Sequence, residues 1–304
     1  MVDTPVLFIT FVRPDYARQT WDGIKAAKPK TLYFYSNKGR TDKEGEVVRN
    51  EEIRAYIKEV DWECDLHTWF RDECVNVYDS LRGAIDWLFE NEEQGIVLEE
   101  DCVPTLGFFS YADQLIAKFK NDRRIWFISG DNFINYNPGG YDYIFSHHSQ
   151  IYGWASWRDR WNSIDWNLTT LDLFLSDGYV NYLFPFAKLA RDRISIMKRA
   201  KNWLLQTQCW DGIFYANMLM NNAMSIYPRE NLITNIGVSG EHKKGRKPTI
   251  WNTPSTFVES YYKIVNEPKL YIPNPLFEKT LYNVTWKQVS ILGRILGKIK
   301  SVFS

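Results

Sequence analysis

The 304-residue chain has no net charge, because 37 Lys and Arg balance 37 Asp and Glu. This balance favours no nucleic-acid partner, and any anionic ligand has to be held by local charges. Cysteine is scarce as well. The four cysteines form no CxxC pair and no Cys/His spacing typical of zinc, which argues against a zinc site and a disulfide framework. This usage fits a reducing compartment, and we expect a cytoplasmic protein.

Long apolar runs and glycine-rich phosphate loops are also missing. No segment has the roughly eighteen uninterrupted apolar residues of a membrane-spanning helix. The apolar stretch 5–12 has no basic region ahead of it and no small-residue cleavage site, so it predicts a first strand rather than a signal peptide. No GxGxxG follows that strand and no P-loop occurs, which argues against a dinucleotide dehydrogenase and a P-loop NTPase.

The first half of the chain alternates apolar runs with helical patterns. The expected strands are 5–13, 31–35, 66–70, 95–98 and 125–129, and the expected helices are 15–27, 47–60, 77–89 and 108–119. Repeated strand–helix units predict an α/β fold with a mostly parallel sheet that helices cover on both faces. Ligands of such sheets gather beyond the carboxyl ends of the strands.

An acidic triplet stands at one such strand end. Glu99, Glu100 and Asp101 directly follow the apolar run 95–98. Three carboxylates at the end of a buried strand repel one another, and removing them from water without a cation costs several kcal/mol each. A divalent metal carrying a diphosphate would compensate this charge, since hard cations prefer carboxylate oxygens and keep positions open for phosphate. The alternative is an exposed acidic turn.

Three further polar side chains follow predicted strands, namely Arg13, Asn37 and Arg71. Because the carboxyl ends of parallel strands meet at one edge of a sheet, we expect these side chains to face the same crevice as the triplet.

The C-terminal part has a different pattern. Residues 246–276 are rich in proline and predict a tail that runs over the surface. From Val284 the pattern becomes a basic amphipathic helix, which either lies on an anionic membrane surface as a peripheral contact or docks on protein. We therefore expect a domain over 1–245 and a tail over 246–304.

Several motifs that occur in order resemble those of one enzyme family, and they lie at 98–104, 127–133, 151–157, 210–211 and 231–237. Together they resemble nucleotide-diphospho-sugar transferases of the GT-A fold, in particular bacterial sugar transferases related to N-acetylglucosaminyltransferase I. The resemblance covers residues 4–245. It implies a mixed, Rossmann-like sheet and a metal-dependent, inverting glycosyltransferase. The enzyme would transfer a hexosyl or N-acetylhexosaminyl group from a UDP-sugar to a glycan, lipid-linked or protein acceptor.

The resemblance also implies a role for individual acids. Asp101 resembles the residue that coordinates a divalent metal, usually Mn²⁺ and otherwise Mg²⁺, between the two phosphates of the donor. Glu99 and Glu100 resemble neighbours that contact ribose or sugar. Asp211 resembles the general base of an inverting transferase; alternatively it caps the apolar helix that follows.

The nucleotide would be held by residues spread along the sequence. Arg13 resembles a first-strand residue that holds the nucleotide, and Arg71 a residue of its pocket. Asn37 stands where the family often has an aspartate near the base, so its contact would be a neutral hydrogen bond. His242 stands where some relatives close the site on the phosphates. Arg13 could instead pair with a surface acid, and His242 could belong to a solvated basic turn.

Two candidates rest on their position in the sequence. Asp131 follows a predicted strand and either lines the sugar pocket or forms an Asx turn. Trp154 is a candidate for stacking on a sugar, with core packing as the alternative. The pattern departs from the family at 74–77, where related sequences carry Asn-Leu-Gly. A sugar nucleotidyltransferase and a non-catalytic carbohydrate-binding protein on the same scaffold are the competing functions.

Overall fold

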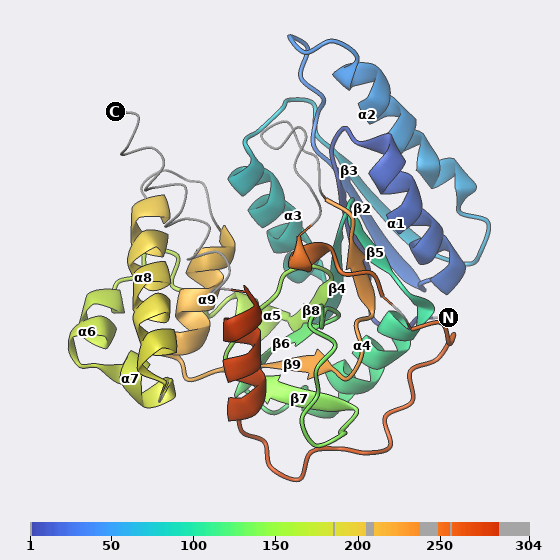
Figure 1. Cartoon of the computed structure of the whole chain (residues 1–304). Coiled ribbons are helices and arrows are strands. Elements are labelled where there is room, and N and C mark those ends of the chain that lie inside the picture. The colour runs from blue at the N-terminus through green and yellow to red at the C-terminus, as the bar shows by residue number, and fades with distance from the viewer. Residues whose placement is uncertain (1, 185, 205–209, 238–248, 256, 286–304) are drawn as a thin grey trace, which may run out of the picture.

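The computed structural model describes residues 2–184, 186–204, 210–237, 249–255 and 257–285 (Figure 1). Its strands are β1 (Val6–Thr10), β2 (Thr31–Ser36), β3 (Asp65–Phe70), β4 (Gln94–Glu99), β5 (Cys102–Pro104), β6 (Ile125–Ser129), β7 (Tyr143–Ser146), β8 (Trp154–Trp157), β9 (Met224–Pro228) and β10 (Ile233–Asn235). Its helices are α1 (Pro14–Ala27), α2 (Glu46–Arg54), α3 (Val77–Asn91), α4 (Leu106–Phe119), α5 (Arg158–Trp161), α6 (Leu171–Ser176), α7 (Tyr179–Leu183), α8 (Ala187–Leu204) and α9 (Trp210–Met220), with 3₁₀ turns at Ala55–Glu59 and Ile250–Asn252.

Eight of these strands form one sheet in the order β3-β2-β1-β4-β8-β6-β9-β7, and β10 pairs with β5 in a separate ribbon. Strands β1 to β4 are parallel to one another. β8 runs antiparallel between β4 and β6, β9 is parallel to β6, and β7 is antiparallel to β9. All strands of the sheet except β7 and β8 therefore run in one direction. The predicted α/β class, with a mixed and mostly parallel sheet, is confirmed.

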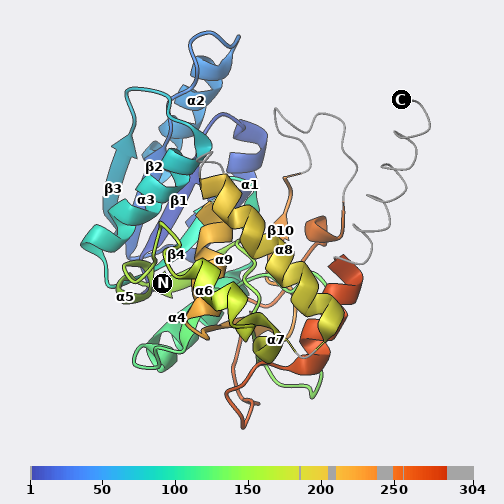
Figure 2. The ribbon, with the colours of Figure 1, turned by 90° about the vertical axis from the view of Figure 1, so that its left-hand side faces the viewer.

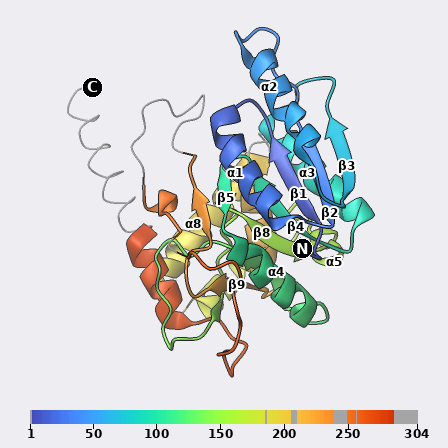
Figure 3. The ribbon, with the colours of Figure 1, turned by 90° about the vertical axis from the view of Figure 1, so that its right-hand side faces the viewer.

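The strands are apolar on both sides because helices cover both faces of the sheet. In β1, Val6 and Phe8 pack with α1 and α4 on one face, whereas Leu7 and Ile9 pack with α3 and α9 on the other. Figure 3 shows α1 and α4 on the near face, and Figure 2 shows α3, α8 and α9 on the opposite side. Period-two alternation within continuous apolar strands thus builds two separate cores.

Local signals set where the helices begin. Pro14 occupies the first turn of α1, where a missing N–H costs no hydrogen bond. The side chain of Asn76 accepts a hydrogen bond from Asp79 N at 3.0 Å and caps α3. Thr105 accepts one from Phe108 N at 3.3 Å and caps α4. These starts place β1 and β4 so that Arg13 and the acidic triplet lie just beyond their carboxyl ends.

The described part of the C-terminal segment packs on the sheet domain. The Tyr262 hydroxyl donates to the backbone oxygen of Asp142 at 2.7 Å. A helix over 275–285 buries Phe277 and Leu281 against Tyr227 and neighbouring side chains. The boundary near residue 245 stays a prediction, and the expected basic helix lies almost wholly outside the described residues. In the described part of the chain, no helix is both long and apolar enough to cross a lipid bilayer.

Candidate active site

The acidic triplet lies at the carboxyl edge of the parallel strands, as expected, and Arg13 reaches across to it from the end of β1. Arg13 Nε donates to Glu100 Oε1 at 2.5 Å, and Arg13 Nη1 lies 3.0 Å from Asp101 Oδ2. The two acids are 5% and 18% exposed, whereas the Arg13 side chain is 32% exposed. One arginine therefore serves two carboxylates at the junction of β1 and β4.

Glu100 is the most enclosed of the three acids. Besides Arg13, its carboxylate accepts a hydrogen bond from Phe11 N at 2.7 Å, and its backbone oxygen accepts one from the Thr20 hydroxyl at 3.0 Å. Burial raises the pKa of the Glu100 carboxyl, and the Arg13 guanidinium works against that rise. Through these contacts Glu100 holds β1, α1 and Arg13 together. Its contact with ribose or sugar stays a prediction.

Glu99 connects the triplet with a residue from far along the chain. Burial and the neighbouring charges of Asp101 and Asp211 raise the pKa of Glu99 to about 8, although Arg13 opposes the rise. Asp211 is thus among the charges that act on Glu99, and its role as general base stays a prediction. Burial and neighbouring carboxylates thus both disfavour a negative charge on Glu99.

Asp211 lies in the first turn of α9, directly after Trp210. The N-terminal end of a helix presents unpaired N–H groups and a positive dipole end, so it stabilises a carboxylate there. Trp210 is buried and stacks on Trp154 with ring centroids 5.9 Å apart, which fixes the start of α9 against the sheet. The core thus determines where the Asp211 carboxylate is held.

Tyr152 is a site residue that sequence reasoning did not assign. Burial raises the pKa of its hydroxyl, and the nearby acids Asp131, Asp211 and Glu99 add to the rise. Gly153, which follows it, has φ +70°, a conformation that favours glycine and turns the chain into β8. A tyrosine directly before such a glycine, which is followed by the aromatic strand residue Trp154, was the available signal.

Asp131 lies next to this group in a closed position. It is 2% exposed, its Oδ1 accepts a hydrogen bond from Phe133 N at 2.8 Å, and its buried Oδ2 has no hydrogen-bond partner among the described residues. Burial raises the pKa of its carboxyl well above the ordinary value. The backbone contact is that of an Asx turn. Because Oδ2 has no partner there, it is the atom that would contact a bound sugar, and this contact stays a prediction.

A short segment after β10 closes over Asp101. Ile236 N donates to the Asp101 backbone oxygen at 2.9 Å, and Asn235 Oδ1 accepts from Gly237 N at 2.8 Å. A β-carbon at Gly237 would collide with the Asp101 carboxylate, so only glycine allows this approach. The segment continues toward His242, which lies outside the described residues.

Asn37 and Arg71 follow β2 and β3 at the same edge of the sheet. The Asn37 amide donates to Val75 O at 2.9 Å and accepts from Val75 N at 3.1 Å, so it fastens the loop that departs from the family pattern. Arg71 Nε donates to the Tyr35 hydroxyl at 2.5 Å, and its guanidinium lies over the Trp69 ring at 4.5 Å. Nucleotide contacts by both residues stay predictions.

Trp154 lies in the core. It is 1% exposed and stacks on Phe127 with ring centroids 5.1 Å apart. Its other ring neighbours include Trp161 and Trp210. These contacts correspond to the packing alternative, and a sugar would reach this ring only after the cluster had opened.

The arrangement of Glu99 and Asp101 suits a metal ion that is bound partly by protein and partly by a ligand better than an ion bound by protein side chains alone. Among the described residues, no three His, Cys, Asp or Glu side chains are grouped so that they could hold a metal ion. Ions such as Mg²⁺ in phosphate sites are bound through one or two carboxylates, and water and phosphate oxygens complete the shell. Asp101 is the partly open carboxylate here, and the raised pKa of Glu99 marks a place where added positive charge would be stabilising.

Neither family models nor curated proteins match this sequence. Among solved structures, the mannosyltransferase PcManGT from Pyrobaculum calidifontis, in complex with GDP-Man and Mn²⁺, is 10% identical with a TM-score of 0.37 over 54% of this chain and 49% of that one. The glycosyltransferase GlyE from Streptococcus pneumoniae TIGR4 is 12% identical with a TM-score of 0.34, over 74% and 45%. HddC from Yersinia pseudotuberculosis is 8% identical with a TM-score of 0.32, over 53% and 78%.

The chain therefore spans about half the length of the first two of these structures. With TM-scores below 0.5, the three likenesses carry no argument about function or site residues.

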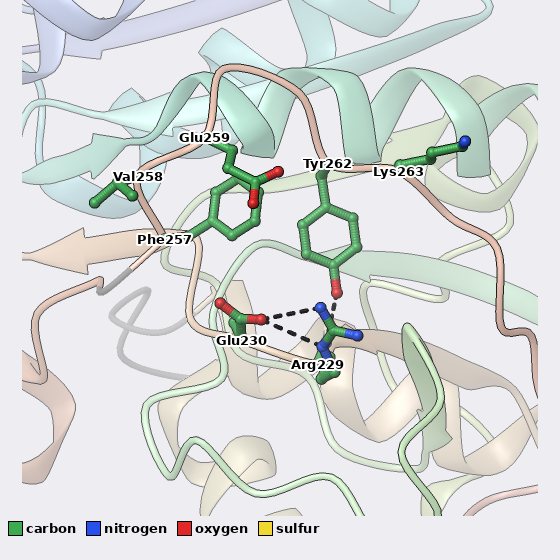
Figure 4. Close-up of a pocket in the computed structure, with 7 residues that line it drawn as sticks. All are labelled: Arg229, Glu230, Phe257, Val258, Glu259, Tyr262 and Lys263. Carbon is green, nitrogen blue, oxygen red and sulfur yellow. Dashed lines mark hydrogen bonds and ion pairs between the residues drawn. The ribbon is translucent and has the colours of Figure 1, made fainter.

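A surface pocket of about 180 Å³ lies elsewhere, between the end of β9 and the C-terminal segment (Figure 4). Its lining residues include none of the predicted site residues, and they are Arg229, Glu230, Phe257, Val258, Glu259, Tyr262 and Lys263. Arg229 is already paired with Asp142 at 2.9 Å and with Glu230 at 3.1 Å. These acids offset the charge of Arg229, and the other charged residues of the lining are Glu259 and Lys263.

Proposed function

We propose that the chain is a glycosyltransferase of GT-A fold that transfers a sugar from a nucleotide-sugar donor, a UDP-sugar, with inversion at the anomeric carbon. The supporting observation is the convergence of Glu99, Asp101 and Asp211 at the carboxyl edge of the sheet, where burial first of all, and then the charges of the two aspartates, raise the pKa of Glu99 to about 8. Ionising several carboxylates in such an enclosed place is costly unless a cation compensates their charge. The motifs at 98–104 and 210–211 support the same function.

In this proposal Asp211 acts as the general base. The acceptor hydroxyl has a pKa far above neutral, so it becomes a nucleophile only when a carboxylate removes its proton. Asp211 takes that proton while the acceptor oxygen forms a bond to the anomeric carbon and the bond to the diphosphate breaks. Asp211 lies in the first turn of α9, where the positive end of the helix dipole favours a negative charge.

Asp101, with Glu99 beside it, would hold a divalent ion, Mn²⁺ or Mg²⁺. When bound, such an ion supplies Lewis-acid stabilisation of the charge that develops on the leaving diphosphate. Arg13 keeps the Asp101 carboxylate at the edge of the sheet and adds a positive charge on the same side. Arg71 and Asn37 are proposed to contact the nucleotide, and Asp131 the donor sugar.

One pair of incubations tests the proposal and separates it from the nucleotidyltransferase alternative. The protein is incubated with a panel of UDP-sugars and Mn²⁺, and in parallel with UTP and sugar 1-phosphates. We expect slow release of UDP in the first set and no pyrophosphate in the second. Pyrophosphate release would instead support a nucleotidyltransferase, and no turnover together with sugar binding would support a carbohydrate-binding protein.

The acceptor is proposed to be a glycan, a lipid-linked sugar or a protein. Contact of the C-terminal helix with a membrane remains part of the proposal.

A further inference from the structure

Helix α8 presents a basic face to solvent. The helix carries six Lys and Arg but a single Asp, although the whole chain is electrically neutral. Its inward face is apolar and includes Leu189, Met197 and Ala200. Five of its six basic residues are exposed, and they are Lys188, Arg191, Lys198, Arg199 and Lys201.

Three of these residues, Lys188, Arg191 and Lys198, form a stripe along the helix. They are separated by three and seven residues, so they share one face, on which the polar Ser195 and Asn202 also lie. From residue 188 to 198 the stripe is roughly 15 Å long at 1.5 Å per residue. Lys201 pairs with Asp172 on α6, and this exposed pair is weak enough to exchange partners.

Exposed aromatic and aliphatic side chains lie on the two short helices that precede α8. Tyr182 is 84% exposed, Leu173 is 61% exposed and Tyr179 is 51% exposed. Helices α6, α7 and α8 occupy one side of the molecule, at the left of Figure 1 and toward the viewer in Figure 2. Basic side chains beside exposed Tyr and Leu are the combination that partitions into the headgroup region of an anionic bilayer.

The position of the α8 surface in the molecule agrees with a lipid bilayer as its partner. Burial and the nearby Asp192 of α8 raise the pKa of the Tyr282 hydroxyl, so the helix that ends the described chain at Thr285 lies close to α8. The remaining 19 residues, 286–304, contain four Lys and Arg and no Asp or Glu. Helix α8 also packs against α9, the helix whose first turn carries Asp211.

We propose that the exposed face of α8, with Tyr179 and Tyr182, docks the protein on a membrane that contains anionic lipids. Each Lys or Arg near such a surface adds to the attraction, and the tyrosines insert at the level of the headgroups. The inference goes beyond the proposed function and does not depend on it.

Co-sedimentation of the full chain with vesicles tests this surface. The vesicles are phosphatidylcholine alone, or phosphatidylcholine mixed with phosphatidylglycerol. We expect binding to the mixed vesicles only, and at least about tenfold weaker binding by the triple variant Lys188→Gln/Arg191→Gln/Lys198→Gln. Tyr182→Ser is expected to weaken binding without changing its dependence on salt.

A second triple variant, Lys28→Gln/Lys43→Gln/Lys58→Gln, removes the same charge from exposed lysines elsewhere and should bind like the unmodified chain. Thermal unfolding confirms that both variants are folded. Equal binding by both triple variants would overturn the inference and assign any membrane contact to other residues. Binding to a soluble polyanion such as heparin, with none to the mixed vesicles, would also overturn it.

Discussion

Replacing Arg13 by Met removes the cation from a carboxylate that is almost fully buried. Glu100 is 5% exposed and keeps one hydrogen bond, from Phe11 N at 2.7 Å, after the guanidinium is gone. Breaking a buried ion pair from one side costs about 3–5 kcal/mol, because the remaining charge has no partner. Arg13 is itself 32% exposed, and water that enters its place recovers part of this cost. We therefore expect a loss of roughly 2–4 kcal/mol in the free energy of unfolding.

Arg18, in the helix α1 that follows Arg13, provides a matched control. Its side chain is 35% exposed, almost the same as Arg13, and it pairs with Glu59 at 2.7 Å. Glu59 is 32% exposed, so its charge stays hydrated when Arg18 is replaced. Arg18→Met should cost at most about 1 kcal/mol.

Urea unfolding followed by circular dichroism measures both variants. The double variant Arg13→Met/Glu100→Gln should recover most of the lost stability, because no unpaired buried charge remains. Equal losses for Arg13→Met and Arg18→Met, or no recovery in the double variant, would refute the view that burial of Glu100 sets the cost.

Three further predictions follow from the site and its surroundings. Asp211→Asn should lower transfer by about 10²–10⁴-fold while donor affinity in calorimetry is unchanged, and near-normal turnover would remove Asp211 from the mechanism. Glu59→Gln should destabilise the protein by roughly 1 kcal/mol at pH 7. Hydrogen bonding from Arg18 lowers the pKa of Glu59 to about 2, so this contribution is complete above the unfolded pKa near 4.5 and lost as the pH falls from there to about 2; a pH-independent difference would contradict it. Trp154→Ala should cost about 3–5 kcal/mol in urea unfolding, because the ring is fully buried, and a loss below 1 kcal/mol would mean that it packs loosely.

The sequence allowed the parallel half of the sheet to be predicted because most of its strands are apolar runs that alternate with helical patterns. The same rule brought together Arg13 and Glu100, which are 87 positions apart, at the strand ends. β7 and β8 were not predicted as strands. Each has only four residues, and both pair antiparallel within a segment whose glycines and asparagines indicate loops.

The site itself was only partly accessible from local patterns. Asp211 lies in an apolar helix, and no spacing rule connects it with Glu99; the resemblance alone suggested their convergence. The environment of Trp154 depends on Phe127 and Trp210, which come from different elements, so no local pattern could distinguish packing from sugar contact. Tyr152 was missed because its neighbours Asp131 and Asp211 are brought to it by the fold.

The central claim is that the acids at the end of β4 bind a cation that in turn holds the diphosphate of the donor. Isothermal titration of UDP into the protein, with and without Mn²⁺, tests it when the unmodified chain is compared with Asp101→Asn. The account predicts that Mn²⁺ strengthens UDP binding to the unmodified chain and that this strengthening disappears in Asp101→Asn. The same Mn²⁺-dependent affinity in both proteins would contradict it.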